Sequence, residues 1–148
     1  MNNLRSVDIP IDVLIVDMDW HETWGLRKKN PAKDAYGQRI GWTGYTWQAQ
    51  LFPSPSNFLE WTEKEDLKVA LNLHPASGVE PFEAQYEAFA ADYGWDKPGE
   101  GVPFRMSQEK WADSYFKTVL GPMEDDGVDF WWLDWQQWKE SKYNPGLS

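Results

Sequence analysis

Three short apolar runs limit most strongly how this chain can fold. They lie in the segments 12–20, 67–74 and 128–135, which read DVLIVDMDW, LKVALNLH and VDFWWLDW. Apolar residues at successive positions are typical of strands that are covered on both faces, as in parallel sheets. Stretches with the spacing of helices separate the three runs. This alternation of strands and helices predicts an α/β fold with a parallel sheet and right-handed crossovers.

The stretches between the strands carry helix signals. The first predicted helix covers 54–66, between the first and second strands, and the next covers 80–93. Gly94 is placed to end that second helix in a left-handed conformation. A third helix is predicted after Ser107, and Gly121–Pro122 is expected to stop or kink it because proline lacks the amide hydrogen of a helix interior. Both connections between the three predicted strands therefore contain helices.

Polar side chains stand at the end of each predicted strand. Asp17 and Asp19 end the first strand, Asn72 and His74 end the second, and Asp134 ends the third. In parallel α/β folds the carboxyl ends of the strands meet at one rim, where ligands bind. A carboxylate at such a position is costly to bury without partners, so packing alone does not explain these residues. The pattern predicts a polar site at the strand ends.

The composition narrows the class of ligand. The formal net charge of −10 argues against nucleic acid as the ligand, because its phosphates require Lys and Arg.

No apolar run approaches the ~20 residues needed to cross a membrane, and the N-terminus shows no signal peptide. Cysteine is absent, which leaves the cellular compartment open. The eleven tryptophans offer flat apolar faces that match the faces of a sugar ring, although they also suit a core.

The same segments resemble glycoside hydrolase family 31, a family of α-glucosidases and α-xylosidases. The resemblance covers about residues 12–137, and its marks are DVLIVDMDW, FPSPSNFLEW followed by LKVALNLHP, and GVDFWWLDW. It implies a partial (β/α)8 TIM barrel of about three consecutive parallel βα units, corresponding to the second, third and fourth barrel strands. It also implies a retaining hydrolase that acts on α-linked sugars, such as an oligosaccharide or glycoside, without a cofactor or metal.

The resemblance assigns roles to particular residues. Asp134 stands where the family has its catalytic nucleophile, and Trp132 stands where the family lines the sugar subsite. Asp17 matches a residue that hydrogen-bonds sugar hydroxyls, and Asn72 matches a position in the pocket wall. His74 is a further candidate for substrate binding, standing where many relatives have aspartate, and it puts the choice of sugar in doubt. The implied reaction forms an ester between Asp134 and the sugar, assisted by a second, protonated carboxyl group about 5–5.5 Å away.

That second carboxyl group is expected to lie outside this chain. Beyond Asp134 the sequence holds one acidic residue, Glu140, which does not suit the role. Residues 1–148 are therefore interpreted as a fragment of one catalytic barrel domain, with a long loop excursion at about 21–53. We expect the isolated fragment to be inactive and to associate with itself, because an open piece of barrel exposes strand edges and an apolar face.

Other functions fit parts of the same pattern. A noncatalytic carbohydrate-binding module would use the aromatic residues without needing a carboxylate at position 134. A metal-dependent glycosyltransferase would use Asp17-Met18-Asp19 to hold a divalent cation, since hard cations prefer carboxylate oxygens. A metal hydrolase would be built on His21, His74 and the aspartates at the strand ends. Metal dependence separates the last two from the others, and replacement of Asp134 separates a binding module from a hydrolase.

Overall fold

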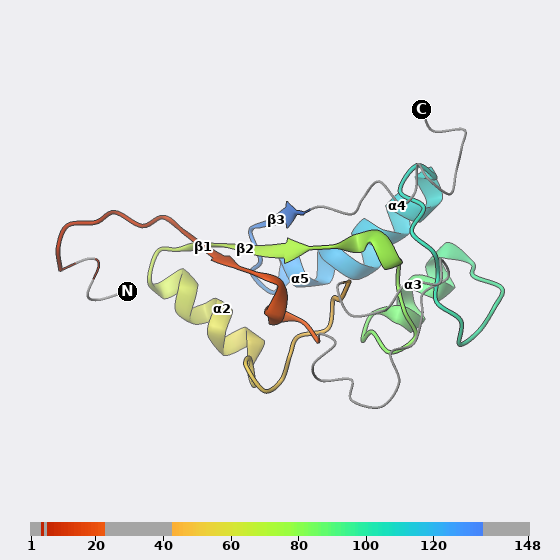
Figure 1. Cartoon of the computed structure of the whole chain (residues 1–148), viewed down its shortest axis with the longest axis horizontal. Coiled ribbons are helices and arrows are strands. Elements are labelled where there is room, and N and C mark those ends of the chain that lie inside the picture. The colour runs from red at the N-terminus through yellow and green to blue at the C-terminus, as the bar shows by residue number, and fades with distance from the viewer. Residues whose placement is uncertain (1–3, 5, 23–42, 135–148) are drawn as a thin grey trace.

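A three-stranded parallel sheet forms the centre of the computed structural model, which describes residues 4, 6–22 and 43–134 (Figure 1). The strands are β1 (Val13–Val16), β2 (Lys68–Leu73) and β3 (Phe130–Leu133), in the spatial order β1-β2-β3. Both pairs are parallel, so β2 is hydrogen-bonded on both edges. The predicted α/β arrangement of strands and helices is confirmed.

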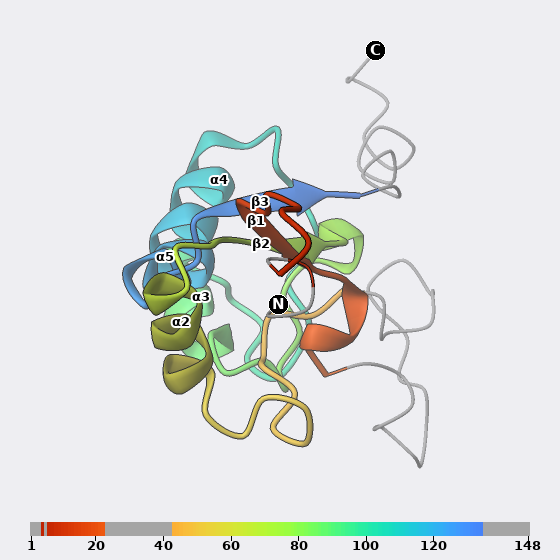
Figure 2. The same cartoon turned by 90° about the vertical axis from the view of Figure 1, so that its left-hand side faces the viewer.

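The helices lie together on one side of this sheet (Figure 2). The connection between β1 and β2 contains α2 (Pro55–Lys64). The connection between β2 and β3 contains α3 (Tyr86–Tyr93), α4 (Glu109–Tyr115) and α5 (Gly121–Asp125). Their buried side chains form one core with the sheet, which includes Leu59, Leu71, Phe89, Trp111 and Val119.

Neighbouring side chains along each strand face opposite ways, as the period of two in a strand requires. Trp131 packs against the helix-side core, and its indole donates a hydrogen bond to Glu124 Oε1 of α5 at 2.7 Å. Trp132 is not part of this core and is 42% exposed. Trp131 therefore faces the helix layer, and Trp132 faces the opposite side of the sheet.

The first strand is shorter than predicted. It ends at Val16, and a single 3-10 turn, η1 (Met18–Trp20), follows at once. The carboxylate of Asp17 accepts a hydrogen bond from the amide of Met18 at 2.7 Å and so begins that turn. Short acidic side chains compete in this way with the hydrogen bonds of a strand. The expectation of a strand continuing to Trp20 is therefore wrong.

The start of one predicted helix needs correction, and of the two outcomes expected at Gly121–Pro122, a stop is not observed. The helix predicted from residue 80 begins at Tyr86, and turns occupy the residues before it. Its end is as predicted, because Gly94 adopts φ 77° and ψ 43°. Pro122 does not stop the chain of helices, since α4 runs through a π-helical segment, η3 (Phe116–Leu120), into α5. The wider turn accommodates a proline that cannot donate its hydrogen bond.

A side chain at the start of β3 fixes its position relative to β2. The carboxylate of Asp129 accepts hydrogen bonds from the amide of Val69 and from Lys68 Nζ, each at 2.8 Å. Partial burial acts to raise the pKa of Asp129, but these two bonds and the charge of Lys68 lower it overall. The contact joins residues sixty positions apart in the sequence. It therefore sets the pairing of the two strands at the end opposite to the predicted site.

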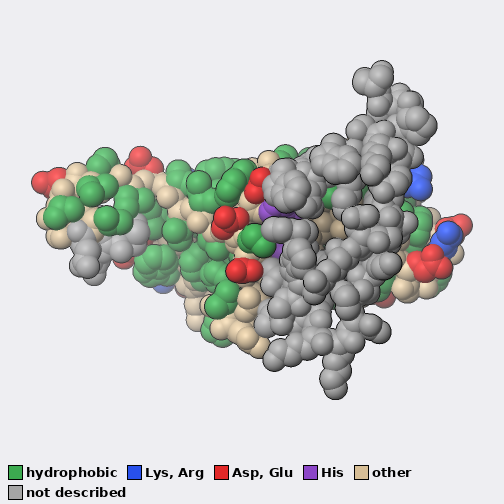
Figure 3. Space-filling model, viewed as in Figure 1, with side chains coloured by type: hydrophobic (Ala, Val, Ile, Leu, Met, Phe, Trp, Pro, Cys, Tyr) green, Lys and Arg blue, Asp and Glu red, His purple; other side chains and the backbone are tan. Residues whose placement is uncertain are grey.

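The face of the sheet that lies away from the helices exposes apolar side chains, which gather there in Figure 3. Ile15 is 56% exposed, and Val13, Phe130 and Trp132 are each at least 40% exposed. In the described residues β1 and β3 pair only with β2, so each presents an unpaired edge. None of the described helices is both long and apolar enough to cross a lipid bilayer.

We expect residues 1–148, prepared alone, to associate into dimers or larger particles. Exposed strand edges and contiguous apolar surface both favour contacts between copies. Size-exclusion chromatography with light scattering measures the mass directly. A monomer of 17.3 kDa over a range of concentrations would contradict the expectation.

Candidate active site

The parallel register brings the ends of the three strands to one rim. Val16 pairs with Leu71, and Leu73 pairs with Leu133. The residues that follow on β2 and β3, His74 and Asp134, therefore leave the sheet side by side. The amide of Asp134 continues the ladder by donating to the carbonyl of Leu73 at 2.9 Å. The strand-end convergence predicted from the sequence is observed.

Two side chains from β2 and its end reach the carboxylate of Asp134. Asn72 Nδ2 donates a hydrogen bond to Asp134 Oδ2 at 3.1 Å. His74 Nε2 lies 3.4 Å from the same oxygen. Asn72 and His74 are buried, whereas the Asp134 side chain is 27% exposed. The carboxylate thus lies at the rim of the sheet, held from the buried side and open in part to solvent, and it does not point into the hydrophobic layer.

The imidazole of His74 is buried, and two carboxylates, those of Asp134 and Asp17, act on it. Burial lowers the pKa of His74, and the carboxylates of Asp134 and Asp17 act in the other direction without cancelling that shift. The neutral imidazole is therefore more favoured in the fold than in free histidine. Asp17 follows Val16, which pairs with Leu71, so the end of β1 contributes to the same rim.

The main chain of the second strand end is held by two side chains from outside the sheet. The indole of Trp20 donates a hydrogen bond to the carbonyl of Asn72 at 2.8 Å. The hydroxyl of Thr43 donates to the carbonyl of His74 and accepts from the amide of Ser77 at 3.0 Å. Trp20 and Thr43 are both buried. Asn72 and His74 therefore extend from a fixed backbone.

The segment that supplies Thr43 is itself tied down by a buried glutamate. Glu83 Oε2 accepts hydrogen bonds from the amides of Tyr45 and Thr46 at 3.1 and 3.0 Å. The neighbouring Gly44 lies against His21, and a Cβ on this glycine would come within 2.3 Å of the ring. Only glycine fits there without movement. Residues 43–46 of the predicted loop excursion therefore pack against the end of β2. Residues 23–42 of the excursion lie outside the described residues.

Four of the five predicted site residues lie at this rim. Asn72 and His74 contact Asp134, and the charge of Asp17 acts on His74. The fifth, Trp132, is the register partner of Asn72 on β3. Its ring therefore stands on the same face of the sheet, two positions before Asp134. Thr43 and Glu83 were missed because nothing in their local sequence marks them, and their partners lie 31 to 38 residues away.

Comparison with known proteins decides the family. The family model of the glycosyl hydrolases family 31 TIM-barrel domain matches residues 1–146. The chain belongs to glycoside hydrolase family 31. The resemblance stated from the sequence is confirmed, and the three parallel βα units are accordingly part of a (β/α)8 barrel.

Two crystal structures of family 31 proteins share this fold. One is an α-xylosidase from a soil metagenome complexed with xylose, at 12% identity and a TM-score of 0.55. The other is the α-xylosidase of Xanthomonas citri, at 18% identity and a TM-score of 0.56. Each match covers 90% of this chain but only 18% and 14% of the respective neighbour. A search of curated proteins finds no match.

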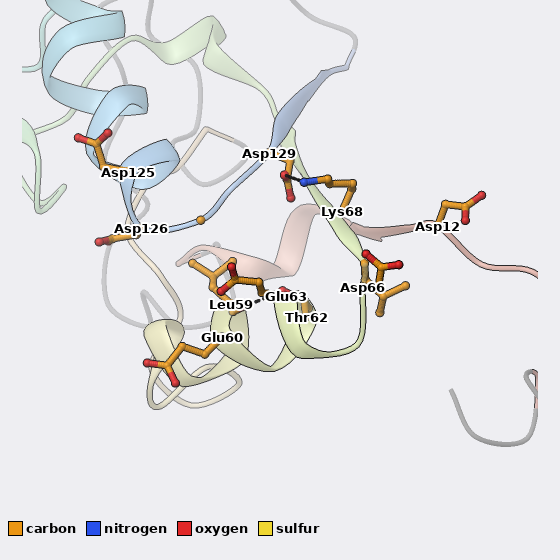
Figure 4. A pocket seen from close by; sticks show the side chains of 12 residues that line it. Asp12, Leu59, Glu60, Thr62, Glu63, Asp66, Lys68, Asp125, Asp126 and Asp129 are labelled. Carbon is orange, nitrogen blue, oxygen red and sulfur yellow. Dashed lines mark hydrogen bonds and ion pairs between the residues drawn. The ribbon is translucent and has the colours of Figure 1, made fainter.

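A cavity of about 500 Å³ in this family 31 chain lies away from the strand-end rim (Figure 4). Its lining includes Asp12 and Asp129, which adjoin the starts of β1 and β3, together with Glu63 and Asp66 from α2 and the turn after it. Lys68 crosses it to pair with Asp129. In barrels, the face at the starts of the strands contributes to stability, whereas the opposite face carries the chemistry. The cavity is thus separate from the candidate site.

The glycosyltransferase and metal-hydrolase alternatives both require a cluster of metal ligands, and the described residues contain none. Within residues 4, 6–22 and 43–134, no three His, Asp or Glu side chains gather as a metal site requires. Asp17 of the Asp-Met-Asp motif uses its carboxylate to cap the turn at Met18. In this family 31 chain the polar side chains of Asn72 and His74 instead contact Asp134.

The lowered pKa of His74 predicts how stability responds to acid. The folded state binds fewer protons than the unfolded state as pH falls below about 6.5, the ordinary histidine value, so protonation favours unfolding there. We expect the complete protein to lose melting temperature between pH 7 and pH 5, and His74→Gln to lose less. Thermal melting at several pH values measures both slopes. Equal slopes would show that His74 is not the group responsible.

Proposed function

We propose that the protein containing these residues is a retaining α-glycoside hydrolase whose nucleophile is Asp134. The observation that carries the proposal is the placement of one carboxylate at the strand-end rim, partly open to solvent and in contact with two buried side chains. Membership of family 31 supports hydrolysis of a glycosidic bond. The two similar crystal structures are of α-xylosidases, so α-xylosides are the first substrates to test.

The proposed reaction has two steps. An oxygen of the ionised Asp134 bonds to the anomeric carbon while the bond to the leaving oxygen breaks, and a second carboxyl group protonates that oxygen. Water then attacks the covalent glycosyl-enzyme, giving up a proton to the same second carboxyl group and releasing Asp134. The donor Asn72 stabilises the charge of the carboxylate between turnovers, since hydrogen bonds favour the ionised form.

The sugar is proposed to lie over the exposed side of this rim. Trp132 offers a partly exposed aromatic face two residues before Asp134, which suits the apolar face of a pyranose ring. Asp17, which is exposed at the end of β1, accepts hydrogen bonds from sugar hydroxyls. Asn72 and His74 form the buried wall behind them.

We also propose that residues 1–148 form the second to fourth units of a single barrel. The chain covers less than a fifth of either similar structure, which supports a contribution of the second carboxyl group from elsewhere in the complete protein. The 148 residues alone are then without turnover. Release of nitrophenol from a nitrophenyl α-xyloside or α-glucoside by the isolated 148 residues would contradict this.

The decisive experiment labels the nucleophile. The complete protein is incubated with a 5-fluoro α-xylosyl or α-glucosyl fluoride, digested, and examined by mass spectrometry for a peptide that has gained one glycosyl group. The label should lie on Asp134, and proton NMR of hydrolysis should show the α-anomer as the first product. A label on another residue, or first formation of the β-anomer, would sink the assignment. Sugar binding without turnover would favour the noncatalytic binding module.

A further inference from the structure

Two buried side chains meet one oxygen of Asp134, and they reach it from the same strand. Asn72 donates to Oδ2 at 3.1 Å, and His74 Nε2 lies 3.4 Å from Oδ2. Asn72 and His74 are two positions apart on β2 and its extension, so their side chains point to the same face of the sheet. Two contacts on one oxygen restrict rotation of the carboxyl group about its bond to Cβ.

We propose that Asn72 and His74 are positioning residues, which set the orientation of the Asp134 carboxylate and do not bind the sugar. This inference rests on the proposed function, because it assumes that Asp134 is the nucleophile. It changes the role that the sequence predicted for both residues, which was substrate binding. The reason for the change is their burial, since Asn72 is 0% and His74 2% exposed. Side chains without exposed surface have none to offer to a sugar in the pocket.

The backbone of both residues is held more firmly than strand pairing alone would achieve. The carbonyl of Asn72 accepts from the Trp20 indole at 2.8 Å, and the carbonyl of His74 accepts from the Thr43 hydroxyl. Trp20 in turn packs edge-on against Trp47, with ring centroids 5.0 Å apart. Trp20 and Thr43 thus hold the backbone of Asn72 and His74, and the side chains of Asn72 and His74 in turn contact the carboxylate of Asp134. Reactive groups held within about half an ångström of the productive geometry require such a supporting shell.

The chemistry depends on this orientation. Attack requires a carboxylate oxygen to approach the anomeric carbon along a narrow range of directions, and a misplacement of about 1 Å costs on the order of 100-fold in rate. Loss of either contact is therefore expected to lower kcat. KM should change little, because the substrate-binding surface is intact. A residue that binds the sugar would raise KM instead.

Removal of the carboxylate gives a test specific to positioning. In an Asp134→Ala variant, azide can attack an α-xylosyl or α-glucosyl fluoride from the face that the carboxylate has vacated. The carbon–nitrogen bond forms as the carbon–fluorine bond breaks, and fluoride and a β-glycosyl azide are the products. In this background no carboxyl group remains to be oriented. Asn72→Ala and His74→Ala should then change the azide-dependent rate less than about threefold.

The experiment compares both substitutions in two backgrounds of the complete protein. With Asp134 present, Asn72→Ala and His74→Ala should each lower kcat about 10- to 100-fold and change KM less than about threefold. His74→Gln, which keeps a nitrogen donor, should recover most of the rate. Asn57→Ala, an exposed change on α2, serves as the matched control and should leave both constants unaltered.

Each alternative result has a clear meaning. Equal losses with and without the carboxylate would overturn the proposal, because the residues would then act on the sugar or on the fold. No loss in either background would overturn it as well. If azide yields no β-glycosyl azide in the Asp134→Ala variant, the nucleophile assignment itself fails, and the positioning role fails with it. If Asn72→Ala does not fold by circular dichroism, Asn72→Ser, which keeps a small polar side chain, and His74→Ala provide the same comparison.

Discussion

Asp134→Ala should lower kcat of the complete protein by about 10⁴-fold or more on an aryl α-glycoside, which corresponds to at least about 5.5 kcal/mol of transition-state stabilisation. The variant lacks the oxygen that would bond to the anomeric carbon, so the two-step route through a glycosyl-enzyme is closed. The Asp134 side chain lies at the rim of the sheet and is 27% exposed, so its removal opens toward solvent and does not leave an enclosed cavity. Initial rates with a nitrophenyl α-xyloside and α-glucoside measure the loss.

The control must separate loss of chemistry from loss of structure. Asp126→Ala makes the same chemical change in the exposed turn after α5 and should leave kcat within about twofold. The melting temperature of the Asp134 variant should stay close to that of the parent protein. A kcat that falls less than about tenfold, in a folded variant, would contradict the assignment of the nucleophile.

Trp20→Ala should destabilise the complete protein by about 3–5 kcal/mol, the cost of deleting a large aromatic side chain from a closely packed interior. Trp20 is fully buried, packs against Trp47 and donates to the carbonyl of Asn72. The substitution leaves a cavity and removes the partner of a buried carbonyl at the same time. Thermal melting should show a fall of roughly 10 °C for a domain of barrel size.

Two further variants divide this effect into its parts. Trp61→Ala removes the same side chain from α2, where 40% of the residue is exposed, and should cost much less. Trp20→Phe keeps most of the packing but lacks the indole N–H, so it should cost about 1 kcal/mol for the lost hydrogen bond plus a smaller packing term. Similar losses for Trp20→Ala and Trp61→Ala would show that Trp20 does not occupy a central place in the core.

The sequence predicted the sheet well because its signal is local and repeated. Successive apolar residues marked the three strands, and polar residues at their ends predicted the rim where Asn72, His74 and Asp134 now lie together. The predicted ends of elements were less accurate. Asp17 ends β1 early by capping a turn, and Pro122 is accommodated by a π-helical segment. The side chain of Asp17 and the amide hydrogen that Pro122 lacks decide the local geometry in these two places. The spacing of apolar residues carries no information about either.

The supporting contacts of the site could not be predicted from the sequence. The indole of Trp20 reaches a carbonyl 52 residues away, and the hydroxyl of Thr43 reaches one 31 residues away. Glu83 holds two amides 37 and 38 residues before it. Hydrogen bonds to the main chain place no demand on the identity of the partner residue, so they leave no paired pattern in a single sequence. The family resemblance named the rim residues but not the side chains that hold them.

The carboxylate of Asp129, at the far end of β3 from Asp134, governs where the proposed nucleophile stands. The two aspartates are five positions apart, with the four residues of β3 between them, which corresponds to about 17 Å at the usual rise. A slide of β3 by two residues would keep every side chain on its face, yet it would detach Asp129 from Val69 and withdraw Asp134 from Asn72 together. The two sets of contacts therefore hold the register of β3 from both of its ends, and a change that frees Asp129 is expected to displace the proposed nucleophile as well.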